Sequence, residues 1–206
     1  MIKYMSLLFE TIKVKDGAVQ NIRYHNDRFN LSRRNLFNID QTVYLEEIIK
    51  VSADYSAGVC KCKVVYDSSI RSISFSRYII KPVNRLITVE CNDIDYGYKY
   101  SDRSRLEELI TQADCSFDEE ILIIKNGLIT DTSYSNVALF DGKDWITPST
   151  PLLSGTRRAN LLERKIVREG EIRIIDLKYF EKIKLFNAML DFDECPVLPT
   201  MNIERI

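Results

Sequence analysis

The sequence is poor in two residue types on which many enzyme motifs depend. It has only 7 glycines, and no two of them are separated by a single residue. The glycine-rich fingerprints that bind dinucleotides and nucleotide phosphates are therefore absent. His25 is the only histidine. A histidine-rich metal site is thus excluded, no metal site is predicted, and a serine–histidine–aspartate triad would require His25.

Charge of one sign and long apolar runs are missing too. The 29 basic and 30 acidic side chains leave a net charge of −1, which argues against a nucleic-acid partner bound through bulk positive charge. No run has the length of a membrane span, and residues 1–8 are too short an apolar stretch for a signal sequence. Five cysteines without a secretion signal fit free thiols that serve as small core residues. The sequence therefore predicts a cytoplasmic protein without a membrane partner.

What is present is typical of a folded protein with one or two domains. Hydrophobic residues make up 45% of the 206 residues and charged residues 29%. The apolar period switches between two residues and helical spacing, which predicts a mixed α+β (mixed α/β) fold. Pro82 marks a boundary. We therefore expect a small α+β domain at residues 1–84 and a larger domain at residues 85–206.

Local patterns and turn signals predict the secondary structure of both domains. Turns are expected at Asp16-Gly17 and Asn126-Gly127. The predicted strands are residues 6–15, 18–24, 59–66, 72–80, 86–90, 120–125, 128–130, 136–140, 145–148, 172–175 and 185–190. The predicted helices begin at His25 and at Gly155-Thr156, and otherwise cover residues 43–53, 104–113 and 179–183.

The first chemically suggestive residue is Lys99, in the segment Asp95-Tyr96-Gly97-Tyr98-Lys99-Tyr100. If the segment is extended, Lys99 shares a face with Gly97 and the tyrosines point the other way. Desolvation on an inward face would lower the pKa of the lysine and leave an amine that can form a Schiff base. Taken alone, however, such a lysine is more often a surface residue.

A polar run between two predicted strands is the second such feature. Residues 130–136 combine hydroxyl side chains with Asp131 and Asn136. Ordinary connections between strands are shorter and richer in glycine. The run therefore suits a ligand with several polar atoms.

Two further stretches could bind an anion. Thr147-Pro148 and then Leu153–Arg158 surround a predicted helix start, whose free N–H groups attract negative charge. Capping by Ser154 explains the same pattern. Arg28, in His25-Asn26-Asp27-Arg28, could hold a phosphate with its planar fork or remain a solvated helix residue.

In this order, these stretches resemble the class IV aminotransferases, the fold-type IV pyridoxal-phosphate enzymes. The resemblance extends from Phe9-Glu10-Thr11 to Asn187-Ala188 and Pro196-Val197, which is nearly the whole chain. It implies a small α+β domain followed by a larger β-pseudobarrel with helices. It also implies an enzyme with pyridoxal 5'-phosphate as cofactor, a small amino-acid-like substrate and a homodimer.

The resemblance assigns roles at the reacting end of the cofactor. Lys99 matches the catalytic lysine that carries the cofactor and moves the α proton of the substrate. Asp131 stands where the family usually has glutamate, five residues before Asn136, and would bond the pyridine nitrogen. We count Asn136 among the cofactor-binding residues. Because aspartate is one methylene shorter than glutamate, the ring would sit deeper, the strand would shift, or a water would bridge the two groups.

The resemblance also assigns the phosphate site. Arg28 matches the arginine of the family's His-x-x-Arg pattern, which holds the phosphate. Thr156 and Arg157 match the residues at a helix start whose backbone amides hold the same phosphate. Thr147-Pro148 matches the Thr-Pro pair that follows the asparagine-containing strand.

The reaction is less closely specified than the family. Phe186-Asn187-Ala188-Met189 resembles the Asn-Ala pattern of 4-amino-4-deoxychorismate lyases, which release 4-aminobenzoate and pyruvate for folate biosynthesis. We therefore expect a lyase, with a branched-chain or D-amino-acid transaminase and a non-catalytic binding protein as alternatives. The chain is shorter than typical members, and we expect it to lack their first strand or hairpin, so that the site is smaller, more open, or completed by a second subunit. Arg103 and Arg157 are candidates for the substrate carboxylate by charge only.

Overall fold

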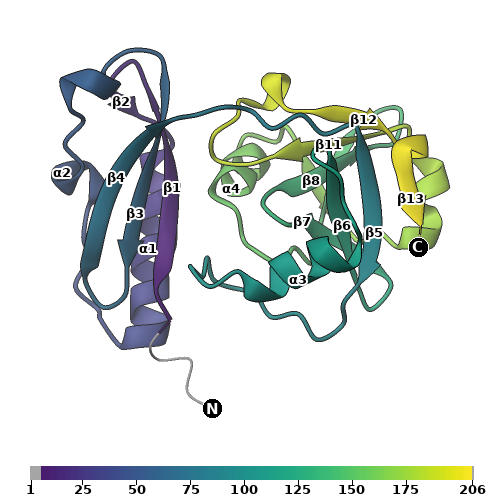
Figure 1. Ribbon diagram of the computed structural model, residues 1–206, viewed down its shortest axis with the longest axis horizontal. Helices are drawn as coiled ribbons and strands as arrows, with labels where there is room; N and C mark the ends of the chain where they lie inside the picture. Colours follow the sequence, from purple (N-terminus) through teal and green to yellow (C-terminus); the bar gives the residue numbers. More distant parts are fainter. Residues whose placement is uncertain (1–5, 206) are drawn as a thin grey trace. The chain divides into compact units, whose positions relative to one another are not determined.

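The structure is a computed structural model that describes residues 6–205. It divides into two compact units (Figure 1). The N-terminal unit contains the chain up to Ile79 together with Tyr98–Asp102. The C-terminal unit contains Ile80–Gly97 and the chain from Arg103 onward. Both units combine helices with sheets, which confirms the mixed α+β class.

The N-terminal unit is built on a four-stranded antiparallel sheet in the order β2-β1-β3-β4. Its elements are β1 (Leu8–Lys15), β2 (Ala18–Val19), α1 (Ile22–Phe37), α2 (Leu45–Ile48), β3 (Val59–Tyr66) and β4 (Ile70–Arg77), with a 3-10 turn at Ala53–Tyr55. Helix α1 lies along one face of this sheet (Figure 1). The buried rings of Phe29 in α1 and Tyr66 in β3 fix that contact, with centroids 4.4 Å apart.

Two predictions for this unit are wrong in extent. The strand expected up to Tyr24 ends at Val19, because Asn21 adopts the left-handed conformation (φ 59°) and α1 begins directly after it. The helix expected over residues 43–53 is reduced to α2. Side chains of α1 hold its start in place of helical bonds, since Asn30 accepts from the Val43 amide and Asn26 accepts from the Leu45 amide. The turn predicted at Asp16-Gly17 is confirmed by positive φ angles at both residues.

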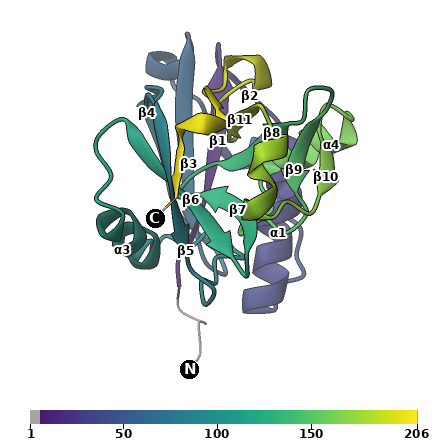
Figure 2. The same ribbon diagram turned by 90° about the vertical axis from the view of Figure 1, so that its right-hand side faces the viewer.

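The C-terminal unit contains a larger, mixed sheet in the order β10-β9-β8-β7-β6-β5-β13, and β11 pairs with both β8 and β12. Its elements are β5 (Arg85–Glu90), α3 (Ser104–Gln112), β6 (Glu119–Lys125), β7 (Leu128–Thr132), β8 (Asn136–Phe140), β9 (Trp145–Pro148), α4 (Thr156–Glu163), β10 (Arg168–Gly170), β11 (Lys182–Phe186), β12 (Val197–Pro199) and β13 (Ile203–Arg205), with 3-10 turns at Ile174–Tyr179, Phe192–Glu194 and Thr200–Asn202. Helix α4 lies beside β9 and β10 (Figure 2).

Strand β6 explains why this unit has two apolar cores. Successive side chains of a strand point to opposite faces of the sheet. Leu122 and Ile124 accordingly belong to one buried cluster, and Ile121 and Ile123 belong to another. Helix α3 covers the second cluster with its buried leucines, and Figure 1 shows it along β5 and β6. A strand buried on both faces reads as a continuous apolar run, as the sequence of β6 does.

The segments predicted after α4 are partly wrong. The strand expected at residues 172–175 is not formed, because a 3-10 turn begins at Ile174. Strand β11 begins at Lys182, within residues 179–183 where a short helix was expected. Pairing with β8 and β12 determines the bounds of β11, and the pattern of these residues alone does not contain that pairing. All five cysteines have free thiols, and all except Cys115 are buried. Within residues 6–205, no helix is long and apolar enough to cross a bilayer.

Candidate active site

The six predicted site residues fall into two groups, one in each unit. Arg28 and Lys99 belong to the N-terminal unit. The C-terminal unit contains the other four, which are Asp131, Asn136, Thr156 and Arg157. Each group is built from different elements of its own unit.

Lys99 is attached to strand β1 by main-chain hydrogen bonds. The Phe9 amide donates to the Lys99 carbonyl (2.9 Å), and the Ser101 amide donates to the Leu7 carbonyl (2.8 Å). A β-bridge joins Leu8 to Tyr100 between these bonds. The segment thus continues the sheet along a stretch of β1 that the two-residue strand β2 leaves uncovered. Because the main chain is held at Lys99 and at the two residues that follow it, the point where the Lys99 side chain begins is fixed.

The Lys99 side chain is half-buried against an aromatic ring. Its Nζ lies 4.7 Å from the centroid of Phe9. A second lysine, Lys63 of β3, lies 4.9 Å from the same centroid. The two amines thus share the Phe9 ring as a neighbour, and an aromatic face attracts a cation.

Arg28 is held by a buried carboxylate. Its Nε donates to Glu10 Oε1 (2.9 Å) and its Nη2 donates to Glu10 Oε2 (2.5 Å), which makes the pair bidentate. His25, one turn earlier on α1, lies with Nδ1 2.6 Å from the same Oε2. The Glu10 and His25 side chains are fully buried, and Arg28 is 13% exposed. One carboxylate therefore organises both polar residues of this face of α1.

The ionisation of this cluster follows from its burial. Burial alone would raise the pKa of the Glu10 carboxyl, but the charge of Arg28 and the hydrogen bond with His25 bring it down to about 2. Burial lowers the pKa of His25, and Glu10 offsets this only in part, while the charges of Arg28 and Lys99 lower it further. At neutral pH His25 is thus uncharged and donates its Nδ1 proton to an ionised Glu10.

Sequence reasoning missed the role of Glu10. A signal was present, because Glu10 is in phase with Leu8, Ile12 and Val14 on the buried side of β1. A charged residue at a position whose strand face is otherwise apolar is predicted to be buried and to need a partner for its charge. His25 had been singled out with Arg28, but its contact with β1 is a tertiary feature.

Asp131 and Asn136 face each other across the turn from β7 to β8. Asn136 Nδ2 donates to Asp131 Oδ1 (2.8 Å) and also to the Leu153 carbonyl (2.9 Å). The Leu153 amide donates to Asp131 Oδ2 (2.9 Å). These bonds fasten the loop before α4 to the turn. A carboxylate has about four lone-pair positions, so acceptor capacity remains on Asp131 after these bonds.

Burial raises the pKa of Asp131 to about 6, although the bonds from Leu153 and Asn136 and the charge of Arg158 lower it. The side chain is almost completely buried. A buried carboxylate with a raised pKa is stabilised in its charged form by any cation or protonated nitrogen brought next to it. Asp131 is therefore suited to hold such a group.

The start of α4 packs closely against this pair. A Cβ added to Gly155 would overlap Asn136 Oδ1 and would lie 3.1 Å from Asn136 Cγ, so only glycine fits here. Gly155 is the N-cap of α4, and a glycine has no side chain with which to bond the first amides of the helix. Thr156 and Arg157 are both buried in the first turn.

Arg157 has an unsatisfied group at this helix start. Its Nη2 donates to Asp191 Oδ1 (3.0 Å). Its Nε is buried and has no hydrogen-bond partner within residues 6–205. Buried guanidinium donors are rarely left unpaired in proteins. Together with the positive end of the α4 dipole, this donor is suited to bind an anion.

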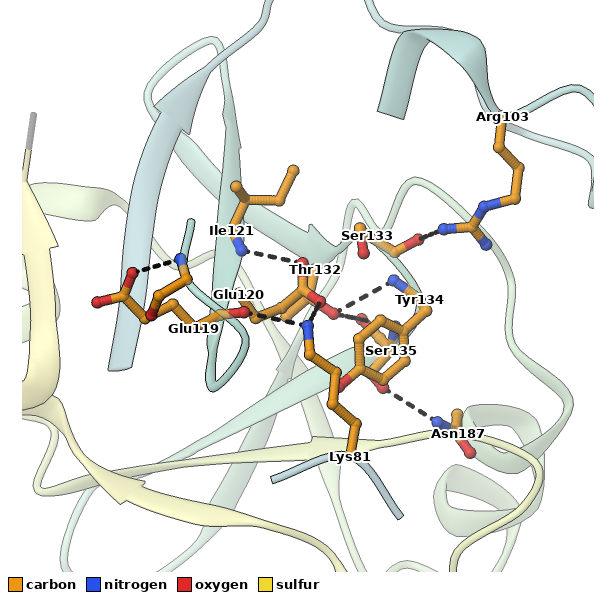
Figure 3. A network of polar contacts seen from close by, with 11 residues as sticks. Lys81, Arg103, Glu119, Glu120, Ile121, Thr132, Ser133, Tyr134, Ser135 and Asn187 are labelled. Carbon is orange, nitrogen blue, oxygen red and sulfur yellow. Dashed lines mark hydrogen bonds and ion pairs between the residues drawn. The ribbon is translucent and has the colours of Figure 1, made fainter. Parts of the chain in front are cut away.

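The hydroxyl groups of the polar run are largely used by the fold. Thr132 accepts from the Ser135 amide (3.0 Å) and donates to the Ser135 carbonyl (3.2 Å), and Asn187 donates to Ser135 Oγ (3.2 Å) (Figure 3). Arg103 donates to the Ser133 carbonyl at 2.9 Å, as Figure 3 also shows. Lys81, beside the Tyr134 ring in the same view, donates to the Glu119 carbonyl (3.1 Å). The run is thus a closed turn that positions Asp131 and Asn136.

Comparisons with known proteins identify the family. The model of the family "Amino-transferase class IV" matches residues 105–192. A Haemophilus influenzae protein without a described function is 36% identical over 184 residues, which are 88% of this chain and 97% of that protein. The crystal structure of a proposed 4-amino-4-deoxychorismate lyase from Haemophilus somnus is also 36% identical, with a TM-score of 0.80 over 90% of this chain and 97% of that one.

A more distant structure has the same fold. A hypothetical aminotransferase from Mycobacterium tuberculosis, solved with alpha-ketoglutarate and PMP bound, is 16% identical, with a TM-score of 0.79 over all of this chain and 85% of that one. The chain described here belongs to the class IV aminotransferase family. The family consists of pyridoxal 5'-phosphate enzymes, and the Mycobacterium tuberculosis protein is also known in a PLP-bound form.

The residues present fit pyridoxal 5'-phosphate. The buried Asp131 carboxylate with spare acceptor capacity suits a protonated pyridine nitrogen. The N-terminal end of α4 and the buried Nε of Arg157, which has no hydrogen-bond partner among the described residues, suit a phosphate. In the N-terminal unit, the Lys99 amine and the guanidinium of Arg28 suit an aldehyde and a phosphate respectively.

Proposed function

We propose that this chain is a pyridoxal-phosphate enzyme that converts 4-amino-4-deoxychorismate to 4-aminobenzoate and pyruvate. The observation that carries the proposal is the buried Asp131 carboxylate, which has acceptor capacity left and a pKa raised by burial. Such a group is suited to the ring nitrogen of the cofactor. The lyase reaction is supported by the Haemophilus somnus relative, because the two chains match over nearly their whole lengths, and by the Asn187-Ala188 pair.

Each of the proposed site residues has a separate role in the reaction. Pyridoxal 5'-phosphate, when bound, supplies an electron sink for the substrate's α carbon. Lys99 attaches the cofactor through Nζ and then uses the same atom as general base for the α proton. Asp131 holds a proton on the ring nitrogen through its carboxylate, since a buried anion favours a charged partner. Asn136 orients that carboxylate by its 2.8 Å hydrogen bond.

The phosphate site is the second part of the proposal. Arg28 offers a charged fork, and α4 offers the backbone amides of Thr156 and Arg157. Charge-assisted hydrogen bonds from arginine and from a helix start are the usual means of holding a phosphate. These residues bind and orient the cofactor and take no part in proton transfer.

A product assay tests the reaction. Purified protein with pyridoxal 5'-phosphate is mixed with enzymatically made 4-amino-4-deoxychorismate, and 4-aminobenzoate and pyruvate are measured. We expect both products in equal amounts. If instead amino acids and 2-oxoglutarate yield glutamate while the first mixture yields nothing, the chain is a transaminase on branched-chain or D-amino acids. Absence of both activities with intact cofactor binding would favour a non-catalytic binding protein.

Lys63 provides a matched control for Lys99, because both amines lie beside the Phe9 ring. We expect Lys99→Ala to lower the rate by roughly a thousandfold or more, since the general base and the attachment point are both lost. Lys63→Ala should stay within about twofold of the parent chain. Equal rates for the parent and Lys99→Ala would refute the role of Lys99.

The proposal includes a cytoplasmic homodimer that acts on a small amino-acid-like molecule. The family resemblance supports the dimer, and sedimentation equilibrium of the purified chain tests it. A monomer with full lyase activity would overturn this part of the proposal alone.

A further inference from the structure

Glu10 is an unexpected residue at its position in the sheet. It lies on β1 in phase with Leu8, Ile12 and Val14, and its side chain is fully buried. An apolar side chain would fill this position without a desolvation penalty. Burial of a carboxylate is unfavourable unless it is paired and hydrogen-bonded. The partners of Glu10 therefore indicate what the charge does.

Those partners restrain one guanidinium. Arginine has a long, flexible side chain, and ordering it opposes the binding of an anion. Glu10 already holds the edge of Arg28 that is formed by Nε and Nη2. His25 donates to Glu10 and fixes the carboxylate in turn. The opposite edge of the guanidinium, formed by both Nη atoms, also carries N–H donors.

The restraint has a competing effect that must be weighed. The negative charge of Glu10 weakens the attraction of Arg28 for a phosphate, and uncharged His25 does not replace the positive charge. Glu10 can therefore aid phosphate binding only by orienting the fork. If orientation of the fork dominates, removing the charge of Glu10 weakens phosphate binding. If attraction between Arg28 and the phosphate dominates, removing that charge strengthens phosphate binding.

We propose that Glu10 is a positioning residue that acts through Arg28 and adapts this arginine to the phosphate of the cofactor. The proposal rests on the function proposed above, because it needs a phosphate group at Arg28. His25 supports Glu10 through the hydrogen bond from Nδ1 and does not itself contact the phosphate.

The test compares two ligands that differ only in the phosphate. The dissociation constants of pyridoxal 5'-phosphate and of pyridoxal are measured for each variant by absorbance titration. The constant for pyridoxal divided by the constant for pyridoxal 5'-phosphate reports how much the phosphate strengthens binding, and this quotient is the ratio used below. A general loss of structure would weaken both ligands and leave the ratio unchanged. We expect Glu10→Gln to reduce the ratio about tenfold or more, because the loss of a charge-assisted, oriented contact has this magnitude.

Glu46 provides a matched control in the same unit. Its carboxylate accepts a hydrogen bond from Asn26 of α1 (2.8 Å). Glu46→Gln should leave the ratio unchanged. If Glu10→Gln does not fold, Arg28→Lys tests whether the orientation of the fork matters, since lysine retains the positive charge and lacks the fork. We expect a similar reduction from Arg28→Lys, and the double variant should lose no more than Arg28→Lys alone.

Each result supports or overturns the proposal. An unchanged or increased ratio in Glu10→Gln, or full retention of the ratio in Arg28→Lys, would show that attraction dominates and would refute the positioning role alone. If the parent chain binds pyridoxal as tightly as pyridoxal 5'-phosphate, the phosphate site itself fails and the proposed cofactor fails with it. Additive losses in the double variant would show that Glu10 does not act through Arg28.

Discussion

Gly155 lies so close to Asn136 that adding one methyl group, in Gly155→Ala, tests how much the Asn136 hydrogen bonds stabilise the C-terminal unit. Gly155→Ala places a Cβ that overlaps Asn136 Oδ1 and lies 3.1 Å from Cγ. Gly155 has φ −70° and ψ 142°, which any residue adopts, so the effect is steric. The amide of Asn136 must move, and its hydrogen bonds to Asp131 and to the Leu153 carbonyl are lost together.

The magnitude follows from those two bonds. A hydrogen bond to a buried carboxylate contributes about 1.5–3 kcal/mol and a neutral one about 0.5–1.5 kcal/mol. Alanine in place of glycine recovers about 0.4–1 kcal/mol by restricting the unfolded chain. We therefore expect the free energy of unfolding of the C-terminal unit to fall by about 2 kcal/mol.

Trp145, the only tryptophan, lies in this unit and reports its unfolding in urea by fluorescence. Gly97→Ala is the control, because its Cβ would meet nothing closer than Asp95 Oδ1 at 3.9 Å and its φ is not positive. Gly155→Ala and Asn136→Ala should also fail to add, since truncating Asn136 removes the overlap. A Gly155→Ala protein within about 0.5 kcal/mol of the Gly97→Ala protein would refute the reasoning.

The remaining predictions concern pH. Burial raises the pKa of Asp131 from 3.8 to about 6, so the folded state binds a proton more tightly. The free energy of unfolding of the C-terminal unit without cofactor should therefore fall by about 2 kcal/mol as pH rises from 4 to 7. Urea titrations at pH 4 and pH 7 should show that Asp131→Asn lacks this loss. If the variant and the parent chain have the same pH dependence, the raised pKa is not that of Asp131. In the N-terminal unit the pKa of Glu10 is lowered to about 2, so its stabilisation is complete above pH 4.5 and disappears as pH falls toward 2, which far-UV circular dichroism can follow. The pKa of His25 is also lowered, so its ring signals in NMR, unique in this chain, should titrate below pH 6.5, and a midpoint at or above 6.5 would show that the cluster is charged differently.

Local sequence determined those elements whose signals lie within a few residues. Strands β3, β8 and β9 have the bounds predicted from their alternation and flanking turns. The turns at Asp16-Gly17 and Asn126-Gly127 have positive φ at every residue, as such pairs favour. These features depend on backbone preference and on the period of apolar residues, both of which are local.

Long-range pairing decided the elements that were predicted wrongly. Residues 43–53 have an apolar spacing that fits a helix, but Asn26 and Asn30 of α1 hold their start by hydrogen bonds. Strand β11 takes its bounds from pairing with β8, whose paired residues lie 42 to 50 positions earlier, and with β12, whose paired residues lie 13 to 17 positions later. Contacts of this kind can override a local propensity that is worth only tenths of a kcal/mol per residue.

For the candidate site, the sequence by itself determined the residue types and, through family resemblance, which positions to consider: a lysine at 99, an arginine at 28 and an acid at 131. Only the tertiary structure decided the charge, the orientation and the hydrogen-bond partners of these side chains. The partner of Arg28 lies 18 residues away on β1, and Asp131 is bonded by a backbone amide 22 residues further along the chain. Burial and hydrogen bonding between distant segments set charge and orientation, and neither is encoded in any short stretch of the chain.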